Sequence, residues 1–225
     1  MINCKDVYLP QNRNILYVVG ILEPQREFQW PKSNGYCIAL AKLLDSKRTN
    51  NMTVAPHTSQ TNQANLKACM KEIVAAGHRP DKENIVIDLD CGSGFRQWQV
   101  ERSPCLTATR ANHGGFYVTS KKRRLTLNDM FRLQGIIPEE VPWQYVKGLT
   151  RVTMGHAIGN AFPVSVMCHL IPAALFSAGI IDAIPKNQFQ EKGLTFSRCG
   201  SPGTRTSDQQ LCSNETRVTS CALSS

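Results

Sequence analysis

The sequence contains few of the residue arrangements that hold metal ions or disulfide bonds. Its nine cysteines form no C-x-x-C pair, and no cysteine–histidine cluster has the spacing of a zinc site. An odd number of widely scattered cysteines also argues against a disulfide framework. We therefore expect reduced thiols in an intracellular protein and no bound metal.

Acidic residues are scarce as well. The chain of 225 residues has 17 Asp and Glu against 26 Lys and Arg, which gives a formal net charge of +9. A balance this basic favours a polyanionic partner. Nucleic acid is the first expectation, and an acidic membrane surface is the second.

The N-terminus lacks the charged and then apolar pattern of a secretory signal. The stretch from Phe162 to Ile181 has no Asp, Glu, Lys or Arg and is long enough for a membrane span. It contains His169 and Pro172, however, and a buried helix of an α/β protein has the same composition. We favour the buried helix and expect no membrane, and a membrane-associated protein stays the alternative.

Hydrophobic periodicity predicts alternating strands and helices. In the first half we expect a strand within residues 7–22, apolar on both faces near Ile15–Val19, then short helices at Tyr36–Leu44 and Asn65–Ala76 with a loop at Ser46–Gln63 between them. In the second half we expect strands at Ile85–Ile87, Leu106–Thr109 and Phe116–Thr119.

Two helices complete the predicted order. Thr126 caps the first, Asp129 has the position of a capping-box acid, and Gly135 ends the helix. The second is the long apolar stretch, which Asn160 opens and Pro172 bends or splits. The tail, residues 184–225, is rich in Ser, Thr, Gln and Gly, and we expect it to be disordered.

Three sequence blocks occur in a distinctive order. They read LPQNRNILY at residues 9–17, RLTLNDMFRLQGI at residues 124–136 and GNAFPV at residues 159–164. The first resembles the Gln-x-Arg-x-Arg strand of DNA cytosine-5 methyltransferases, the second their R-x-L-T-x-x-E-x-x-R-L-Q-G-F block, and the third their closing G-N-[AS]-V/F-P-V block. The resemblance covers residues 7 to about 180.

The resemblance implies an α/β fold. The chain would be the C-terminal part of a Rossmann-like S-adenosylmethionine-dependent methyltransferase domain, with an inserted small, mostly β target-recognition domain. The implied division is a strand of the catalytic domain at 1–22, the target-recognition domain at 23–122, the closing part of the catalytic domain at 123–183 and the tail at 184–225.

The same resemblance implies a reaction and partners. In this family a cytosine is flipped out of double-stranded DNA, a cysteine thiolate attacks C6, a glutamate protonates N3, and S-adenosylmethionine provides the methyl group for C5. The blocks that carry the cysteine and the glutamate precede the first block, and this chain starts just before it. We therefore expect an N-terminal half, from the same gene or a separate chain, and an intracellular location with DNA: the nucleus in a eukaryote, the cytoplasm or nucleoid in a bacterium.

Four residues follow from the resemblance as supporting parts of the site. Gln11 and Arg13 would stabilise the catalytic loop and the target nucleotide, and Asn160 and Ala161 would close one wall of the S-adenosylmethionine pocket. The sequence departs from the family at Ile15, where the second arginine of the strand belongs, and at Asp129, where the family has Glu.

The interval before the second block would contact DNA. Arg102 or Arg110 would read the major groove, because arginine pairs with guanine through two hydrogen bonds. The Gly114-Gly115 turn would approach the backbone, and a basic run would contact phosphates; the alternatives are a flexible turn and a solvated face. The expected DNA-binding residues are Arg102, Arg110, Gly114, Gly115, Lys121, Lys122, Arg123 and Arg124.

Two further motifs have ordinary structural readings. Pro104-Cys105 resembles a Pro-Cys nucleophile but lies in an expected strand, so we interpret Cys105 as a structural thiol. Residues 88–94, DLDCGSG, resemble a nucleotide loop, but Asp90 stands at the first glycine position and no helix pattern follows. The functional hypotheses are thus part of an active methyltransferase, a catalytically inactive DNA-binding module derived from one, or a membrane-associated protein.

We predict that this chain alone transfers no methyl group to DNA, because it offers no credible nucleophile and only part of a cofactor pocket. Incubation with labelled S-adenosylmethionine and DNA measures this. Label at C5 of cytosine that disappears in a Cys105→Ser variant would contradict the structural role assigned to Cys105.

Overall fold

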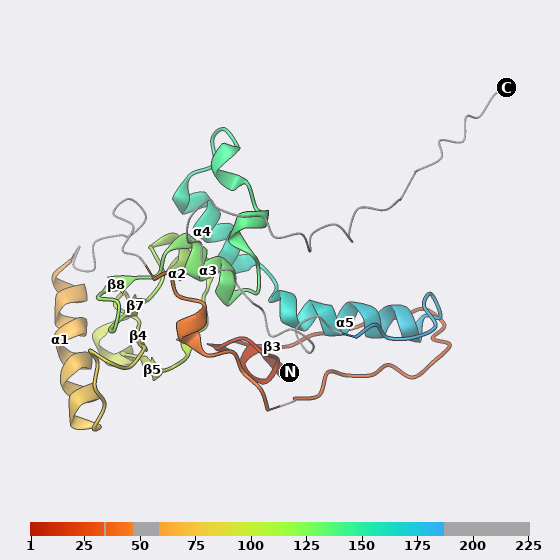
Figure 1. Cartoon of the computed structure of the whole chain (residues 1–225), viewed down its shortest axis with the longest axis horizontal. Coiled ribbons are helices and arrows are strands. Elements are labelled where there is room, and N and C mark those ends of the chain that lie inside the picture. The colour runs from red at the N-terminus through yellow and green to blue at the C-terminus, as the bar shows by residue number, and fades with distance from the viewer. Residues whose placement is uncertain (34, 47–58, 187–225) are drawn as a thin grey trace, which may run out of the picture.

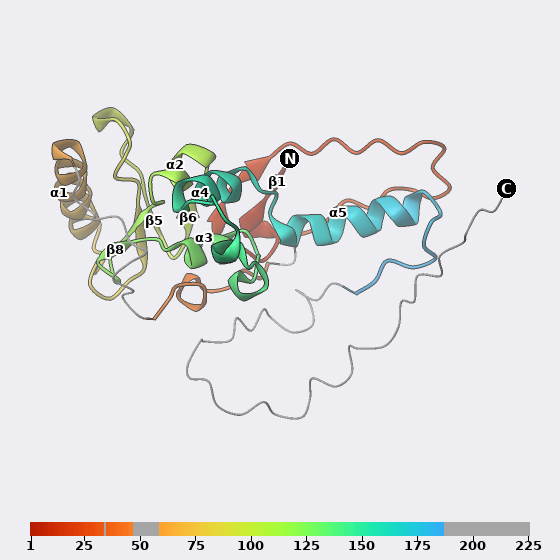
Figure 2. The same cartoon turned by 90° about the horizontal axis from the view of Figure 1, so that it is seen from above.

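The computed structural model describes residues 1–33, 35–46 and 59–186. Helix α1 (Gln60–Ala75) lies at one end of the long axis and helix α5 (Val164–Ser177) at the other, with α2, α3 and α4 between them (Figures 1 and 2). Most of the expected disordered tail, from residue 187 onward, lies outside the described residues.

A small antiparallel sheet packs against α1. Its strand order is β5 (Trp98–Val100), β4 (Ile85–Ile87), β7 (Tyr117–Val118) and β8 (Arg123–Arg124). Along β4, Ile85 and Ile87 share a hydrophobic cluster with Ile73 of α1, whereas Val86 belongs to the central core on the other face. The strands expected at residues 85–87 and 116–119 are therefore confirmed.

Helix α1 is longer than the expected helix at Asn65–Ala76. It begins at Gln60 because the Ser59 side chain accepts a hydrogen bond from the amide of Asn62 and caps the helix. The helix expected at residues 36–44 is only a single 3-10 turn, η2 (Leu40–Lys42). Of the loop expected at residues 46–63, the last four residues are helical and residues 47–58 lie outside the described part.

The N-terminal segment joins the middle of the chain through very short strands. Strand β1 (Ile2–Asn3) pairs with β3 (Asn14–Ile15), and β2 (Gln11–Asn12) pairs in parallel with β6 (Ser103–Pro104). The longer strand expected over residues 15–19 is wrong. No described strand pairs with residues 16–22, and the Val18 side chain is 87% exposed.

Three helices form the centre of the molecule: α2 (Ala108–Asn112), α3 (Leu127–Leu133) and α4 (Arg151–Asn160). The expected capping box of α3 is confirmed, and Gly135 follows the helix with φ 77°. The strand expected at residues 106–109 is wrong, because the Thr107 side chain caps α2. The remaining 3-10 turns are η1 (Cys4–Asp6), η3 (Ser93–Phe95), η4 (Pro138–Glu140) and η5 (Trp143–Tyr145).

Helices α2 and α4 are in backbone contact. A Cβ atom at Gly155 would lie 2.5 Å from the carbonyl oxygen of Ala111, and one at Gly159 would overlap the backbone of Ala108. These glycines are four residues apart and therefore lie on one face of α4. The close approach exists only because both positions lack a side chain.

The long apolar helix does not begin at Asn160 as expected. Asn160 ends α4, and α5 begins at Val164 after Pro163, whose fixed φ favours the extended conformation seen there. Helix α5 continues through Pro172. Among the described residues no single helix is long and apolar enough to cross a membrane, although the α4–α5 pair, bent by 45°, meets the length and composition limits.

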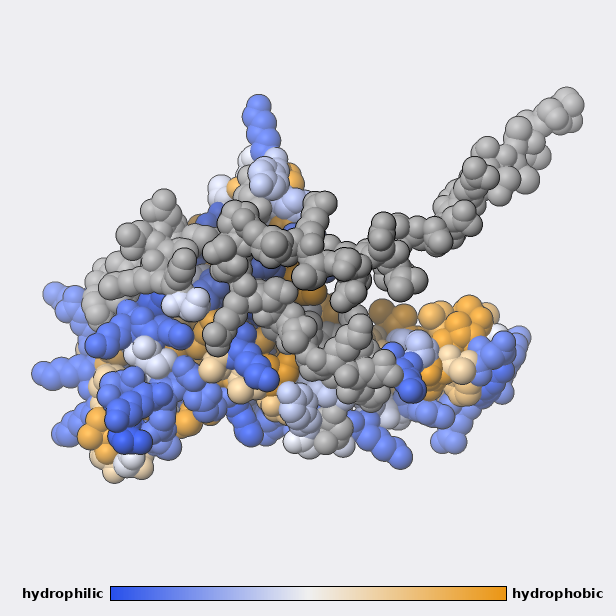
Figure 3. All heavy atoms as spheres, viewed as in Figure 1, coloured by the Kyte–Doolittle hydropathy of each residue, from blue (hydrophilic) through white to orange (hydrophobic). Residues whose placement is uncertain are grey.

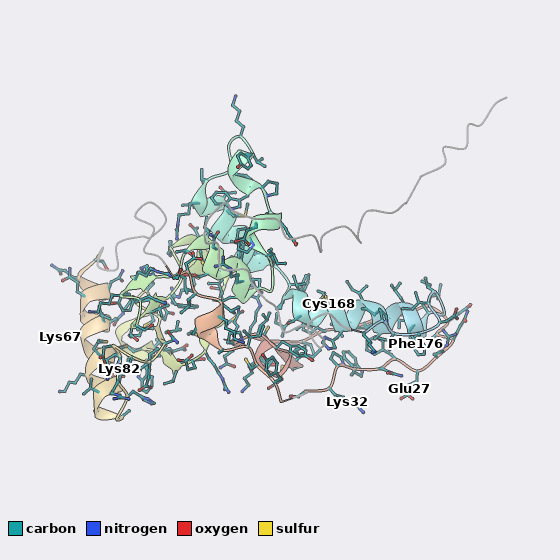
Figure 4. The ribbon with its side chains drawn as sticks, viewed as in Figure 1. Glu27, Lys32, Lys67, Lys82, Cys168 and Phe176 are labelled. Atoms are coloured by element: carbon teal, nitrogen blue, oxygen red, sulfur yellow. The ribbon has the colours of Figure 1, made fainter. Side chains whose placement is uncertain are left out.

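An extended segment runs alongside α5, and Figure 4 labels Glu27 and Lys32 on it. The amides of Gln25 and Arg26 donate to the Ser177 carbonyl at 2.8 and 3.1 Å. The Arg26 guanidinium also lies 4.8 Å from the centre of the Phe176 ring. These contacts fasten the segment to the C-terminal end of α5.

We predict that Gly159→Ala lowers the free energy of unfolding by about 1–3 kcal/mol, because the added methyl group forces α2 and α4 apart. Urea unfolding followed by circular dichroism measures the change. Gly20→Ala is the matched control, since a Cβ there meets nothing within 4 Å. Equal unfolding midpoints for both variants would show that the two helices do not depend on this contact.

Candidate functional site

The guanidinium group of Arg13 lies at the centre of the candidate site. Its Nη1 donates to the carbonyls of Leu106 at 2.6 Å and Gly159 at 3.1 Å, and its Nη2 donates to the carbonyl of Ala161 at 3.2 Å. Two of these acceptors lie at the C-terminal end of α4, where the helix dipole favours a cation. Arg13 thus caps α4 and holds it beside the segment that leads into α2.

Two buried glutamines continue this connection. Gln11 Nε2 donates to the Leu133 carbonyl at 3.1 Å, and Gln134 Nε2 donates to the Ile158 carbonyl at 3.1 Å. The Gln134 carbonyl accepts from the amide of Val164 at 2.8 Å. The three blocks found in the sequence, far apart in the chain, therefore meet in one place.

The C-terminal end of α4 has an accessible rim. The Asn160 side chain is exposed, and its amide contacts His156 Nδ1 at 3.3 Å. The exposed Phe162 ring lies 6.3 Å from the ring of Tyr17, measured between centroids. This rim offers one amide and an aromatic surface, and the Arg13 contact to Ala161 fixes its backbone.

A buried ion-pair network links α3 to β8. Arg123 Nη1 lies 2.6 Å from Asp129 Oδ2, and Arg132 Nη1 lies 2.6 Å from Asp45 Oδ1. Asp129 also accepts from the amides of Asp45 at 2.7 Å and Thr126 at 2.9 Å. The sequence pattern predicted the capping role of Asp129 but gave no signal for Asp45, which is distant in the chain.

A second pair of charges fixes the loop that follows β4. Arg124 donates to both carboxylate oxygens of Asp90, at 2.7 and 2.9 Å, and to the Gly115 carbonyl at 2.8 Å. Arg110 Nε lies 2.8 Å from Asp88 Oδ2. Both carboxylates of the suspected nucleotide loop are thus used in ion pairs, which argues against a cofactor role for them.

The expected DNA-binding residues do not gather on one surface. Arg123 and Arg124, expected to contact phosphates with Lys121 and Lys122, are only 3% and 1% exposed, so these two arginines offer no surface either to a phosphate or to solvent. The carboxylates of Asp129 and Asp90 offset the cost of burying them. Lys122 is exposed and Lys121 is half-buried.

The remaining residues expected to contact DNA also differ in exposure. Arg102 is exposed, whereas Arg110 is paired with a carboxylate. Gly114 and Gly115 are buried, and a Cβ at Gly115 would lie 3.0 Å from the sulfur of Met130. The Gly115 position is therefore explained by close packing against α3.

The six cysteines in the described part of the chain differ in exposure. Burial raises the pKa of the Cys4 thiol to about 12, against the opposing effect of nearby Arg13, and burial also raises the pKa of the thiols of Cys37, Cys69, Cys91 and Cys168. These thiols remain protonated at neutral pH and are poor nucleophiles. Cys105 is exposed and lies just beyond β6, so its expected place inside a strand is wrong.

No group of three or more metal-binding side chains occurs within residues 1–33, 35–46 and 59–186. In a comparison with protein families, the model of the C-5 cytosine-specific DNA methylases matches residues 1–174. Comparisons with curated proteins and with solved structures give no match.

We predict that Asp129→Asn destabilises the fold by about 3–5 kcal/mol, because it leaves the buried Arg123 without its counter-charge. Asp129→Glu keeps the negative charge and should lower the free energy of unfolding clearly less. Chemical unfolding of both variants measures the difference. The role given to the ion pair would be contradicted if Asp129→Asn lowered the free energy of unfolding no more than Asp129→Glu does.

Proposed function

The chain belongs to the family of C-5 cytosine-specific DNA methylases, and we propose that it acts as the C-terminal half of a DNA cytosine-5 methyltransferase. In this proposal the chain contacts double-stranded DNA and closes one wall of the cofactor pocket. The N-terminal half, encoded in the same gene or in a separate chain, supplies the cysteine nucleophile. Methyl transfer to C5 of cytosine then requires both halves.

The convergence of the three blocks at Arg13 is the observation that carries this proposal. Arg13 from the first block bonds to Gly159 and Ala161 of the third, and Gln134 of the second bonds to Ile158 next to the third. The sequence resemblance by itself does not require the three blocks to contact one another in the folded chain. Their presence supports a common site built from the matching residues.

Gln11 and Arg13 fit a positioning role in this site. The side-chain amide of Gln11 and both terminal nitrogens of Arg13 donate to backbone carbonyls of the chain itself. We infer that they fix the end of α4 and thereby the Asn160 side chain. Contact of Arg13 with the target nucleotide would require it to give up at least one of these bonds.

The rim at Asn160 suits part of a cofactor pocket. S-adenosylmethionine supplies the methyl group in this family. The exposed Asn160 amide can donate and accept hydrogen bonds, and the Phe162 ring offers an apolar face. Asn160, Ala161 and Phe162 would form one wall of the pocket, and the partner half would provide the rest.

The partner half would cover an apolar surface beside α5. Leu16, Val18 and Leu22 are exposed on a segment that has no strand partner among the described residues. Figure 3 shows apolar side chains gathered over the α5 end of the molecule, where Ile171 is also exposed. Exposed apolar side chains gathered in this way are typical of a surface that another part of a protein covers.

The opposite end of the molecule would contact DNA. Four of the expected cations, Arg102, Arg110, Lys121 and Lys122, remain at least partly exposed, although Arg110 is paired with Asp88. Lys67 and Lys82 lie at the α1 end (Figure 4). The formal charge of +9 favours this polyanionic partner. The target-recognition role of residues 23–122 rests on this distribution.

A catalytically inactive DNA-binding module is the second candidate. One observation favours it: Ile15, half-buried in β3, stands where the family strand has an arginine. Mixing the chain with a separately produced N-terminal half from the same family decides between the two. Methyl transfer that depends on both polypeptides supports the first proposal, whereas DNA binding without transfer supports the second.

We predict that neutralising Lys121 and Lys122 together, as Lys121→Gln and Lys122→Gln, weakens binding to all duplexes about equally and flattens the salt dependence, because phosphate contacts release counterions. Arg102→Gln should instead change the preference among sequences, by about 1–3 kcal/mol for a lost bidentate base contact. Titration of the full chain against a duplex library at two salt concentrations measures both effects. Binding that is insensitive to salt, or equal behaviour of the two variants, would refute this assignment.

A further inference from the structure

Arg79 and Arg102 differ from the other arginines that the structure describes. Of these ten arginines, seven donate side-chain hydrogen bonds and Arg151 is half-buried. Arg79 and Arg102 are exposed, and within the described part of the chain their guanidinium groups form neither a hydrogen bond nor an ion pair. Both therefore keep all five N–H donors for an anion outside the chain.

Both arginines lie at the same end of the small sheet. Arg102 follows β5 at the point where that strand pairs with Ile85, the first residue of β4, and the turn that contains Arg79 leads into β4 from the same side. In this turn the Arg79 carbonyl accepts from the amides of Lys82 and Glu83 at 3.0 and 2.9 Å. The backbone that carries Arg79 and Lys82 is thus fixed beside the end of β5.

Asn84 ties together the turn before β4, the end of β5 and the turn between β7 and β8. Its side-chain and backbone amides donate to Glu101 Oε1 at 2.9 and 3.1 Å, and its side-chain oxygen accepts from Ser120 Oγ at 2.7 Å. Glu101 precedes Arg102 in the chain, and Ser120 precedes Lys121. The cations of the three segments are therefore held by one framework.

The carboxylates at this end of the sheet are fewer than the cations, and two of them bond to the framework. Glu83 accepts from the amide of Arg79 at 2.8 Å and contacts His78 Nδ1 at 2.8 Å, and these two hydrogen bonds lower the pKa of Glu83. Glu101 is held as described above, and the third carboxylate is that of the exposed Asp81. Five cations at this sheet end form no ion pair within the described residues: Arg79, Lys82, Arg102, Lys121 and Lys122.

Two residues at this sheet end have a strained backbone. Glu101 and Lys122, with φ of 52° and 51°, are two of four non-glycine residues in the described part of the chain that adopt the left-handed conformation. This conformation costs free energy that a glycine would avoid, and residues held in it are concentrated at functional sites. One of the two is a cation of this surface, and the other directly precedes Arg102.

We propose that Arg79 and Lys82 bind phosphates of the DNA backbone beside the base contact proposed for Arg102. This inference rests on the proposed DNA-binding function and adds two contacts that the sequence pattern did not indicate. A planar guanidinium group can bind a phosphate through two hydrogen bonds. Phosphate contacts position a protein on the duplex, whereas base contacts select the sequence. The framework at Asn84 holds the two kinds of contact at a fixed spacing.

The test measures binding of the full chain to labelled duplexes by fluorescence anisotropy over a range of salt concentrations. Arg79→Gln should weaken binding to every duplex about three- to tenfold and reduce the salt slope by about one, because one phosphate contact is lost. Arg79→Lys keeps the positive charge and should keep the salt slope. Arg96→Gln is the matched control, because Arg96 is an exposed arginine before Trp98, at the opposite end of the sheet. It should change the affinity by less than about twofold.

The outcomes separate this inference from the function on which it rests. If the unmodified chain binds no duplex DNA even at low salt, the proposed function fails and the phosphate contacts with it. If the chain binds DNA but Arg79→Gln and Arg96→Gln lower the affinity and the salt slope equally, only the Arg79 contact is overturned. A loss for Arg79→Gln that is confined to some sequences would also overturn it, because such a loss indicates a base contact.

Discussion

The bonds from Arg13 to three backbone carbonyls hold the centre of this structure together. A helix end inside a protein leaves carbonyl groups without partners, and burying them unpaired is costly. Arg13 and Gln134 satisfy the carbonyls of Ile158, Gly159 and Ala161 from two other segments of the chain. The position of the Asn160 rim, and with it any contribution to a cofactor pocket, depends on this arrangement.

Charges inside the chain are balanced in pairs. Arg123 with Asp129 and Arg132 with Asp45 form a buried network that joins β8, α3 and the segment before residue 47. Burying such charges costs several kcal/mol per ion unless geometry and hydrogen bonds compensate. Here the carboxylates also accept backbone amides, so the network specifies which segments meet as well as stabilising them.

The sequence predicted the helices and strands whose formation depends on residues close together in the chain. Helix α3 with its capping box and strand β4 follow from local patterns, and the order of three blocks indicated the family. It did not predict α2, because the choice between strand and helix at Leu106–Thr109 depends on packing against the glycines of α4. It also misplaced Arg123 and Arg124 in solvent, since only folding brings Asp129 and Asp90 beside them. The roles of Gln11 and Asn160 came from the resemblance alone.

The anchors on either side of residues 47–58 have a consequence for the length of the connection between them. Asp45 is held by Arg132 and Thr126, and Ser59 caps α1, so each side is fixed by its own contacts. The free energy of closing a connection rises by only about 0.6 kcal/mol when its length doubles. A change in the number of residues between Asp45 and Ser59 therefore leaves both described ends, and the Arg13 centre, in place.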